Sequence, residues 1–345
     1  MSTDETPRSS AVRSSETAEE QALGEGSGAA AQLDGRYVLD REIAHGGMGR
    51  VFVGRDLRLG REVAVKVLRK PDASSMARFE QEVRLAARLQ HPGIVTVYDA
   101  GFWSTGEPFL VMKLVLGRSF ERAIAEAETM ADRLALLPHL AAVADALAYA
   151  HDQGVVHRDL KPENIILGAF GETVVLDWGL AKDLGAQAAA SSDGVAGDSP
   201  APPTSAGLTR EGAVVGTPAY MAPEQAEGEA VDVRADVYAI GAILYHMLSG
   251  EPPASDGTMT PLVQLEPHVP RDPLAIVDKA MARRRTERYP SAFELGEDLR
   301  RFLAGQWVSA RRYSLAARLG RLSTRRTLFA LAMVAMALGL VYGRC

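Results

Sequence analysis

The spacing of apolar and polar residues changes along the chain and predicts two kinds of segment. Between residues 37 and 114 most apolar residues fall in short strand-like runs, interrupted by one stretch with helical spacing. After residue 118 they recur at three- and four-residue intervals, which is typical of amphipathic helices. The pattern therefore predicts an α+β protein in which a small β-rich region is followed by a larger helical one.

The individual elements follow from the same pattern. The predicted strands are Tyr37–Ala44, Arg50–Arg55, Glu62–Leu68, Ile94–Tyr98 and Phe109–Leu114. The predicted helices are Ser75–Gln90, Ala131–Asp152, Asp236–Leu248, Leu274–Ala282 and Ser291–Leu303.

Two segments lack the apolar residues that a core needs. Residues 1–35 are rich in Ser, Thr, Ala, Glu and Gly and are expected to be disordered. Residues 185–207 contain 18 Ala, Ser, Gly or Pro in 23 positions, which predicts a flexible insertion. A loop of this length inside a compact domain favours a functional segment.

Composition narrows the class of protein. With 47% hydrophobic and 24% charged residues, the chain is typical of globular proteins. Its single cysteine, Cys345, excludes an intramolecular disulfide and a multi-cysteine zinc site. No apolar segment opens the chain, so no cleaved signal peptide is expected.

The basic C-terminal end predicts a membrane anchor. Residues 305–345 carry seven arginines and no acid, and residues 305–326 are a basic segment preceding an uncharged run. Residues 327–343 are then the predicted transmembrane helix, although they are shorter than the roughly 20 residues such a helix prefers. A buried terminal helix is the alternative. The arginines favour a membrane over nucleic acid as the partner, with the preceding domain on the cytoplasmic side of a single-pass protein.

Five short motifs carry candidate chemistry. The first is the glycine turn Ala44–Val51, which could hold phosphates on its backbone amides or simply close a hairpin. The second is Lys66, on a strand whose neighbouring side chains are apolar. A helical wheel places Glu82, unlike Glu80, within the apolar arc of its helix, so Glu82 is the expected partner of Lys66.

The other three motifs lie in the helical region. In His157–Asn164 an acid, Asp159, precedes an amide by five residues on a loop, with a lysine between them. In Val174–Gly179 an aspartate ends an apolar strand, as a metal ligand or a turn-capping residue would. The fifth motif is Gly216–Glu224, which closes the flexible segment.

Taken in this order, the five motifs resemble the signature set of protein kinases. The resemblance covers roughly residues 37–304 and is strongest to bacterial serine/threonine kinases of eukaryotic type. It implies the two-lobed protein kinase fold in residues 36–304, with an N-lobe at 36–114 and a C-lobe at 115–304. It also implies ATP and Mg²⁺ as cofactors, with Mn²⁺ as an alternative metal, and protein Ser/Thr hydroxyls as substrate.

The resemblance also implies a role for each matching residue. The catalytic residues would be Asp159, which takes the hydroxyl proton, Lys161, and the pair Lys66 and Glu82. Asn164 and Asp177 would ligate the metal. The nucleotide would be bound by Ala44, Gly46, Gly47, Gly49, Val51, Ala64, Lys66, Met112, Lys113, Val115, Asn164 and Asp177. Glu224 and Arg288 would form the ion pair that anchors the activation segment.

Two departures and two alternatives accompany this interpretation. Ala44 replaces the first glycine of the turn, and Lys113 replaces the usual acid of the segment that joins the lobes.

A pseudokinase scaffold is one alternative function, which the presence of Lys66, Asp159 and Asp177 disfavours. A kinase-like enzyme acting on small molecules is the other. An active kinase would further be expected to autophosphorylate, for which a homodimer is one route.

Overall fold

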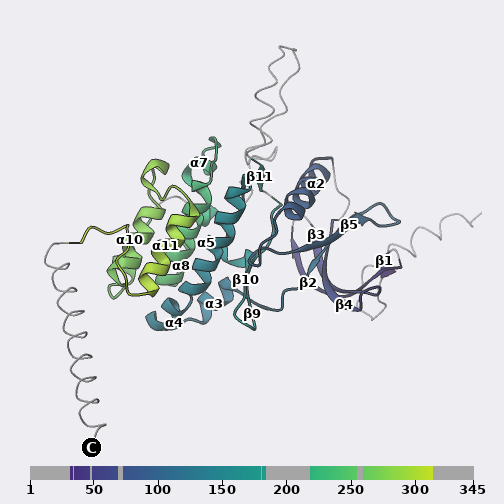
Figure 1. The fold of residues 1–345 in the computed structure, drawn as a ribbon, viewed down its shortest axis with the longest axis horizontal. Helices are drawn as coiled ribbons and strands as arrows, with labels where there is room; N and C mark the ends of the chain where they lie inside the picture. Colours follow the sequence, from purple (N-terminus) through teal and green to yellow (C-terminus); the bar gives the residue numbers. More distant parts are fainter. Residues whose placement is uncertain are drawn as a thin grey trace, which may run out of the picture. The chain divides into compact units, whose positions relative to one another are not determined.

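The computed structural model describes residues 32–33, 35–46, 49–68, 73–179, 181–183, 218–254 and 259–313. Two compact units are distinguished along the chain, coloured by sequence in Figure 1. Unit 1 combines the chain up to Asp72 with Val97–Leu114, and unit 2 combines Ala73–Thr96 with the chain from Val115 onward. The predicted segments 1–35, 185–207 and 327–343 lie wholly or almost wholly outside the described residues.

Unit 1 is one antiparallel sheet with the strand order β1-β2-β3-β4-β6-β5. Its strands are β1 (Gln32–Leu33), β2 (Tyr37–Gly46), β3 (Gly49–Asp56), β4 (Arg61–Val67), β5 (Val97–Phe102) and β6 (Pro108–Lys113). Alternation along β4 places Val63 and Val65 in a core with Val111, and all three side chains are fully buried.

The strand predicted at Ile94–Tyr98 begins later in the structure. Ile94 forms an isolated bridge with Val175, and the Val95 amide donates to the carbonyl of Val175 at 3.1 Å. Those backbone groups therefore bond within unit 2, and β5 of the sheet starts only at Val97.

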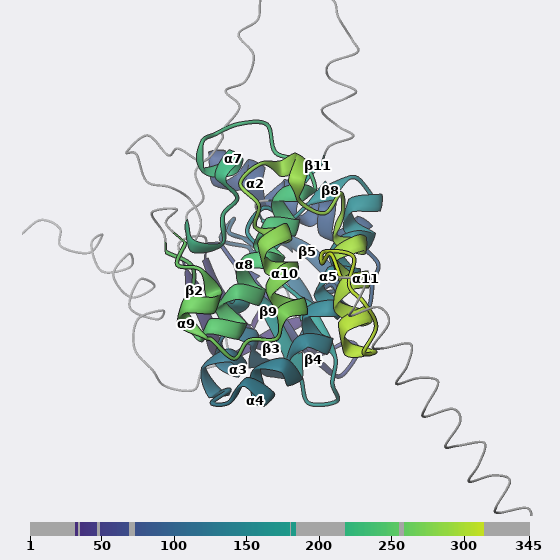
Figure 2. The same cartoon turned by 90° about the vertical axis from the view of Figure 1, so that its left-hand side faces the viewer.

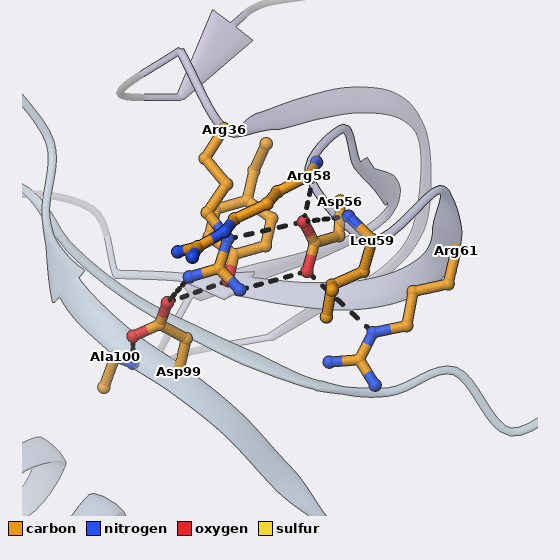
Figure 3. A network of polar contacts seen from close by, with 8 residues as sticks. Arg36, Asp56, Arg58, Leu59, Arg61, Asp99 and Ala100 are labelled. Carbon is orange, nitrogen blue, oxygen red and sulfur yellow. Dashed lines mark hydrogen bonds and ion pairs between the residues drawn. The ribbon is translucent and has the colours of Figure 1, made fainter.

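A polar network stabilises the sheet at the start of β2 (Figure 3). Arg36 donates to Asp56 at 3.1 Å and to Asp99 at 2.7 Å, and the Tyr37 hydroxyl donates to Asp99 at 2.8 Å. The hydrogen bond from Arg36 lowers the pKa of Asp56 despite the burial of that carboxylate. Asp56 ends β3 and Asp99 belongs to β5, so the network joins strands that are not neighbours in the sheet.

Unit 2 is mostly helical, and Figure 2 shows α8, α10 and α11 from one side. Its helices are α2 (Ala73–Arg88), α3 (Phe120–Glu126), α4 (Met130–Ala135), α5 (Leu137–Asp152), α7 (Pro223–Ala226), α8 (Arg234–Ser249), α9 (Leu262–Leu265), α10 (Arg271–Ala280) and α11 (Ala292–Leu303), with 3₁₀ turns η1 (Pro162–Asn164), η2 (Pro218–Tyr220) and η3 (Arg285–Glu287). Ile240, Ile243 and Leu244 of α8 are fully buried, as are Leu137, Leu140 and Leu147 of α5, so both helices contribute to the core of this unit.

The helix predicted at Ala131–Asp152 is two helices in the structure. Thr129 and Asp132 form a capping box at the start of α4, and the chain turns at Leu136 before α5 begins. Pro138 lies in the first turn of α5, where its missing N–H leaves no hydrogen bond unmade. Apolar residues keep the helical spacing on both sides of Leu136, so the sequence pattern does not indicate the turn.

Short strands in unit 2 hold the loops that carry the polar motifs. β7 (Gly117–Ser119), β9 (Ile165–Gly168) and β10 (Thr173–Val175) form a three-stranded sheet in the order β10-β9-β7. β8 (Val155–Val156) pairs with β11 (Lys182–Asp183). The loop from His157 to Asn164 thus lies between β8 and β9.

The chain continues in an ordered conformation beyond α11, and Asp298 holds this extension. The buried carboxylate of Asp298 accepts from the Ser309 amide at 2.7 Å, the Ser309 hydroxyl at 2.8 Å and the Ala310 amide at 2.9 Å. Tyr289 and Arg301 also donate to it, at 2.9 and 3.0 Å. We call residues 305–313 the clasp segment.

Candidate active site

In the glycine turn of unit 1, only glycine fits at position 49. Gly46 and Gly49 pair across β2 and β3, and Gly47 lies outside the described residues. A Cβ atom at Gly49 would lie 2.2 Å from the carbonyl oxygen of Val67, a distance no side chain can occupy. The backbone at Gly49 therefore lies directly against β4.

Lys66 lies at the centre of the sheet of unit 1. It faces Val51 of β3 on one side and Leu110 of β6 on the other, and only 9% of its surface is exposed. On the same strand Ala64 is buried opposite Met112 of β6. Lys113, opposite Val63, is exposed at the end of β6, so its side chain is directed to solvent.

Helix α2 directs Glu82 inward, as the helical wheel predicts. Glu82 is 6% exposed, whereas the Glu80 side chain is 52% exposed and forms an ion pair with Arg84 at 3.6 Å. A Cβ atom at Gly179 would lie 3.1 Å from Oε2 of Glu82, which places this carboxylate beside the Asp177–Gly179 motif. Lys66 belongs to unit 1 and Glu82 to unit 2, so their pairing stays a prediction.

The loop of unit 2 that carries Asp159 is held by a buried carboxylate of α8. Asp236 accepts from the backbone amides of His157 and Arg158 at 2.8 and 2.9 Å and bonds Nε2 of His151 at 2.8 Å. Burial alone would raise the pKa of Asp236, but the hydrogen bonds from His151 and Arg158 outweigh it and lower the pKa. Asp236 is therefore ionised and fixes the backbone directly before Asp159.

Within the loop, three candidate residues lie together. Nζ of Lys161 is 3.2 Å from Oδ2 of Asp159. The Asn164 side chain donates through Nδ2 to the carbonyl oxygen of Asp159 at 2.9 Å. Because the amide nitrogen is used in this way, the oxygen of Asn164 is the atom that can ligate a cation. Pro162 begins the turn η1 that brings Asn164 back towards Asp159.

Asp177 is positioned by its neighbours in the chain. The Leu176 amide donates to the Asn164 carbonyl at 2.8 Å, and the Leu176 carbonyl bonds Nε2 of His157 at 3.0 Å. Trp178 is 1% exposed and packs against the His157 ring at a centroid distance of 4.7 Å. Asp177 itself has a φ of 56°, an uncommon conformation for a residue other than glycine that these contacts maintain.

The expected ion pair of Glu224 and Arg288 is present and buried. Two nitrogens of Arg288 donate to the two carboxylate oxygens of Glu224, at 2.7 and 2.8 Å. The remaining bonds of the guanidinium go to the carbonyls of Ala282, Arg234 and Arg283. Burial alone would raise the pKa of Glu224, and the hydrogen bonds from Arg288 lower it. This pair fixes helix α7 to the rest of unit 2.

Sequence reasoning missed two residues that act on the loop. His151 of α5 bonds Asp236, and Gln225 of α7 donates through Nε2 to the carbonyl of Arg158 at 2.7 Å. His151 lies on a predicted helix, and Gln225 directly follows the Gly216–Glu224 motif. Their spacing from other residues in the sequence does not indicate that they bond Asp236 and Arg158.

The comparisons with known proteins agree with this arrangement. The family described as "Protein kinase domain" matches residues 37–307. "Serine/threonine-protein kinase PknB" of Mycolicibacterium smegmatis is 37% identical over 79% of this chain, and its namesake in Mycobacterium leprae is 36% identical over 79%. The chain spans 44% of the length of each of these relatives.

The solved structures point the same way. The crystal structure of the Mycobacterium tuberculosis PknI kinase domain has a TM-score of 0.60 and 26% sequence identity, covering 80% of this chain and 99% of its own. A β-sheet unit with a buried lysine and a helical unit with the Asp159 loop define the class as a two-lobed protein kinase. Within that class, the chain belongs to the bacterial serine/threonine protein kinases of eukaryotic type.

Proposed function

We propose that the protein transfers the γ-phosphoryl group of ATP to serine or threonine hydroxyls of proteins. The bond between the γ-phosphorus and the bridging oxygen breaks, a bond to the substrate hydroxyl oxygen forms, and the hydroxyl proton passes to Asp159. The observation that carries the proposal is the Asp159 loop, where Lys161 and Asn164 both contact Asp159 and Asp236 fixes the backbone.

The other candidate residues receive their roles in the same proposal. Lys66 and Glu82 would orient the α- and β-phosphates, the glycine turn would cover them, and the strand around Met112 would meet the adenine. Asn164 and Asp177 offer oxygen ligands, the kind Mg²⁺ prefers, so these residues fit the metal. When bound, Mg²⁺ would neutralise phosphate charge, and Mn²⁺ would serve similarly.

Substitution of Asp159 tests the proposal. Asp159→Asn should lower phosphoryl transfer by about 10²–10⁴-fold, because the hydroxyl loses its base. ATP binding, measured by titration calorimetry, should stay near that of the parent. Lys66→Met should also reduce turnover strongly. If both purified variants retain near-normal transfer to a generic protein substrate, the proposal is wrong.

The same assay separates the alternatives. A pseudokinase scaffold would bind ATP and label neither itself nor a protein substrate. An enzyme acting on small molecules would leave proteins unlabelled but consume ATP when given its own substrate. Labelling of a protein substrate that depends on Asp159 supports the kinase over both.

We further propose that autophosphorylation at Thr209 raises the activity. Thr209 lies outside the described residues, and its phosphate would add about −1.5 to −2 charges that an arginine can bind. Arg158 fits this role, since its Nε is buried without a hydrogen-bond partner among the residues that the structure describes. Glu211 would supply part of the effect through its fixed charge. A homodimer would allow one copy to phosphorylate the other.

Phosphosite mapping after incubation with ATP tests this regulation. Thr209 should be modified, and Thr209→Ala and Glu211→Gln should each lower the rate. Thr204 and Ser205 serve as controls, since labelling there would reflect accessibility alone. An unmodified Thr209 together with unchanged rates in both variants would refute the regulatory proposal without affecting the catalytic one.

Membrane anchoring through residues 327–343 is also a proposal, supported by the preceding arginines. Among the described residues, the stretch Met130–Asp152, which comprises α4 and α5, is long and apolar enough to cross a membrane, but half of its apolar 18-residue window is buried inside the protein, as is common in a protein core. The full chain should stay with membranes after carbonate extraction. Recovery of the full chain in the soluble fraction without detergent would exclude the anchor.

A further inference from the structure

The peptide group that joins Arg158 to Asp159 is held from both of its ends. Its carbonyl oxygen, on Arg158, accepts from Nε2 of Gln225 at 2.7 Å. Its N–H, on Asp159, donates to Nδ1 of His157 at 3.3 Å. Because a peptide group is planar, these two bonds together set its rotation. That rotation in turn determines the direction in which the Asp159 side chain leaves the backbone.

The backbone at this point does not adopt its conformation without support. Arg158 has a φ of 70°, a left-handed conformation that is unfavourable for an ordinary L-residue. Asp236 holds the amide of Arg158 at 2.9 Å, and Gln225 holds its carbonyl. Both backbone polar groups of the strained residue are therefore bonded to side chains from distant parts of the sequence.

The tautomer of His157 follows from its two partners. The carbonyl of Leu176 can only accept, so Nε2 of His157 carries the ring proton and donates to it at 3.0 Å. Nδ1 is then the acceptor for the Asp159 amide. Through His157, this side of the peptide group is thus fixed to Leu176, the residue before Asp177, while Gln225 fixes the opposite side.

Gln225 can hold the carbonyl because helix α7 is itself immobilised. The preceding residue, Glu224, forms the buried ion pair with Arg288. The backbone N–H of Gln225 donates to the Ala222 carbonyl at 2.9 Å, and this bond closes the first turn of α7. The donor therefore comes from helix α7, directly after the Gly216–Glu224 motif, so a displacement of α7 would move the peptide group before Asp159.

We propose that Gln225 is a positioning residue for phosphoryl transfer, which orients Asp159 through the Arg158–Asp159 peptide group. The inference rests on the proposed kinase function. Loss of this donor frees one end of the peptide group, and the carboxylate of Asp159 then occupies productive orientations for a smaller share of the time. Turnover should fall, whereas the affinity for ATP should be unaffected because Gln225 is not among the residues expected to bind the nucleotide.

Gln225→Met tests the proposal in the chain of residues 1–345, since methionine keeps the length of the side chain and removes its donor. We expect kcat to fall by about 10-fold, as misplacement of a reacting group by one ångström can cost about 100-fold. KM for ATP and the melting temperature should stay near parent values. The Asp159 amide should exchange faster with deuterium, which a merely space-filling role for Gln225 would not produce.

Two further variants sharpen the test. Gln225→Glu keeps the shape but directs an acceptor at the carbonyl, so its kcat should be at least as low as that of Gln225→Met. The matched control is Gln153→Met, the same chemical change at an exposed glutamine whose side chain bonds Asp152, and its kcat should equal that of the parent.

Each outcome decides a specific question. A kcat within twofold of the parent in Gln225→Met, with unchanged amide exchange, overturns the inference and leaves the kinase function standing. A parent protein without transfer activity overturns the proposed function, and exchange at Asp159 then decides the positioning role. If Gln225→Met does not fold, Gln225→Glu replaces it, and an unchanged kcat in that variant overturns the inference.

Discussion

Removing the cation of the buried ion pair should destabilise unit 2 strongly. In Arg288→Met the Glu224 carboxylate would lose both hydrogen bonds of 2.7 and 2.8 Å, although its site stays closed to solvent. The Arg288 side chain has no exposed surface and that of Glu224 only 6%, so water cannot replace the guanidinium without rearrangement. Three backbone carbonyls would lose a donor in the same change.

The expected magnitude follows from this geometry. Breaking a buried pair by removing one partner costs about 3–5 kcal/mol, because an uncompensated charge stays behind. For a domain of this size each kcal/mol lowers the melting temperature by roughly 2–4 °C, so the midpoint should fall by about 6–20 °C. The double variant Glu224→Leu with Arg288→Met removes the stranded charge and should recover more than half of the loss.

Thermal and urea unfolding of the parent, both single variants and the double variant provide the measurement. The double-mutant cycle isolates the interaction between the two side chains from their separate packing terms. If Arg288→Met costs less than about 1 kcal/mol, or if the double variant is no more stable than Arg288→Met, the destabilisation does not come from a stranded charge.

Two further predictions concern pH and chain length. Burial lowers the pKa of His246 to about 4, so the unfolded chain binds more protons between pH 6.5 and 4. The free energy of unfolding should therefore fall as the pH falls through that window. His246→Gln should make this fall smaller, whereas the same change at the exposed His268 should not. If the free energy of unfolding, measured with urea, changes with pH equally in the parent and in His246→Gln, the prediction is wrong. A chain ending at Ala304 should be about 2–4 kcal/mol less stable than one ending at Tyr313, because it lacks three of the donors to Asp298. Coinciding unfolding curves for the two chains would show that the clasp segment contributes nothing.

The periodic spacing of apolar residues predicted which candidate side chains face the interior of their own strand or helix. Strand alternation placed Lys66 in the interior of the sheet, and the helical period selected Glu82 over Glu80 as the buried acid. Both features depend on spacings of a few residues, which the sequence displays directly. The fold class followed in the same way, from the change in apolar spacing near residue 118.

Contacts across long stretches of sequence could not be predicted in this way. Gln225 bonds a carbonyl 67 residues earlier, and Asp236 bonds amides 78 and 79 residues earlier. No period connects such positions, and the polarity of these side chains does not identify their partners. The turn at Leu136 was missed for a different reason, since the apolar residues on its two sides keep the helical spacing.

The clasp segment has a mechanical consequence for anything attached beyond residue 313. Tension applied to that end of the chain would be carried by contacts of residues 309–311, among them the bonds of Ser309 and Ala310 to Asp298 of helix α11. The ion pair of Arg311 with Asp272, at 2.6 Å, would share the load with a second helix. Within the described residues, load from that end is therefore divided between α10, which carries Asp272, and α11, which carries Asp298.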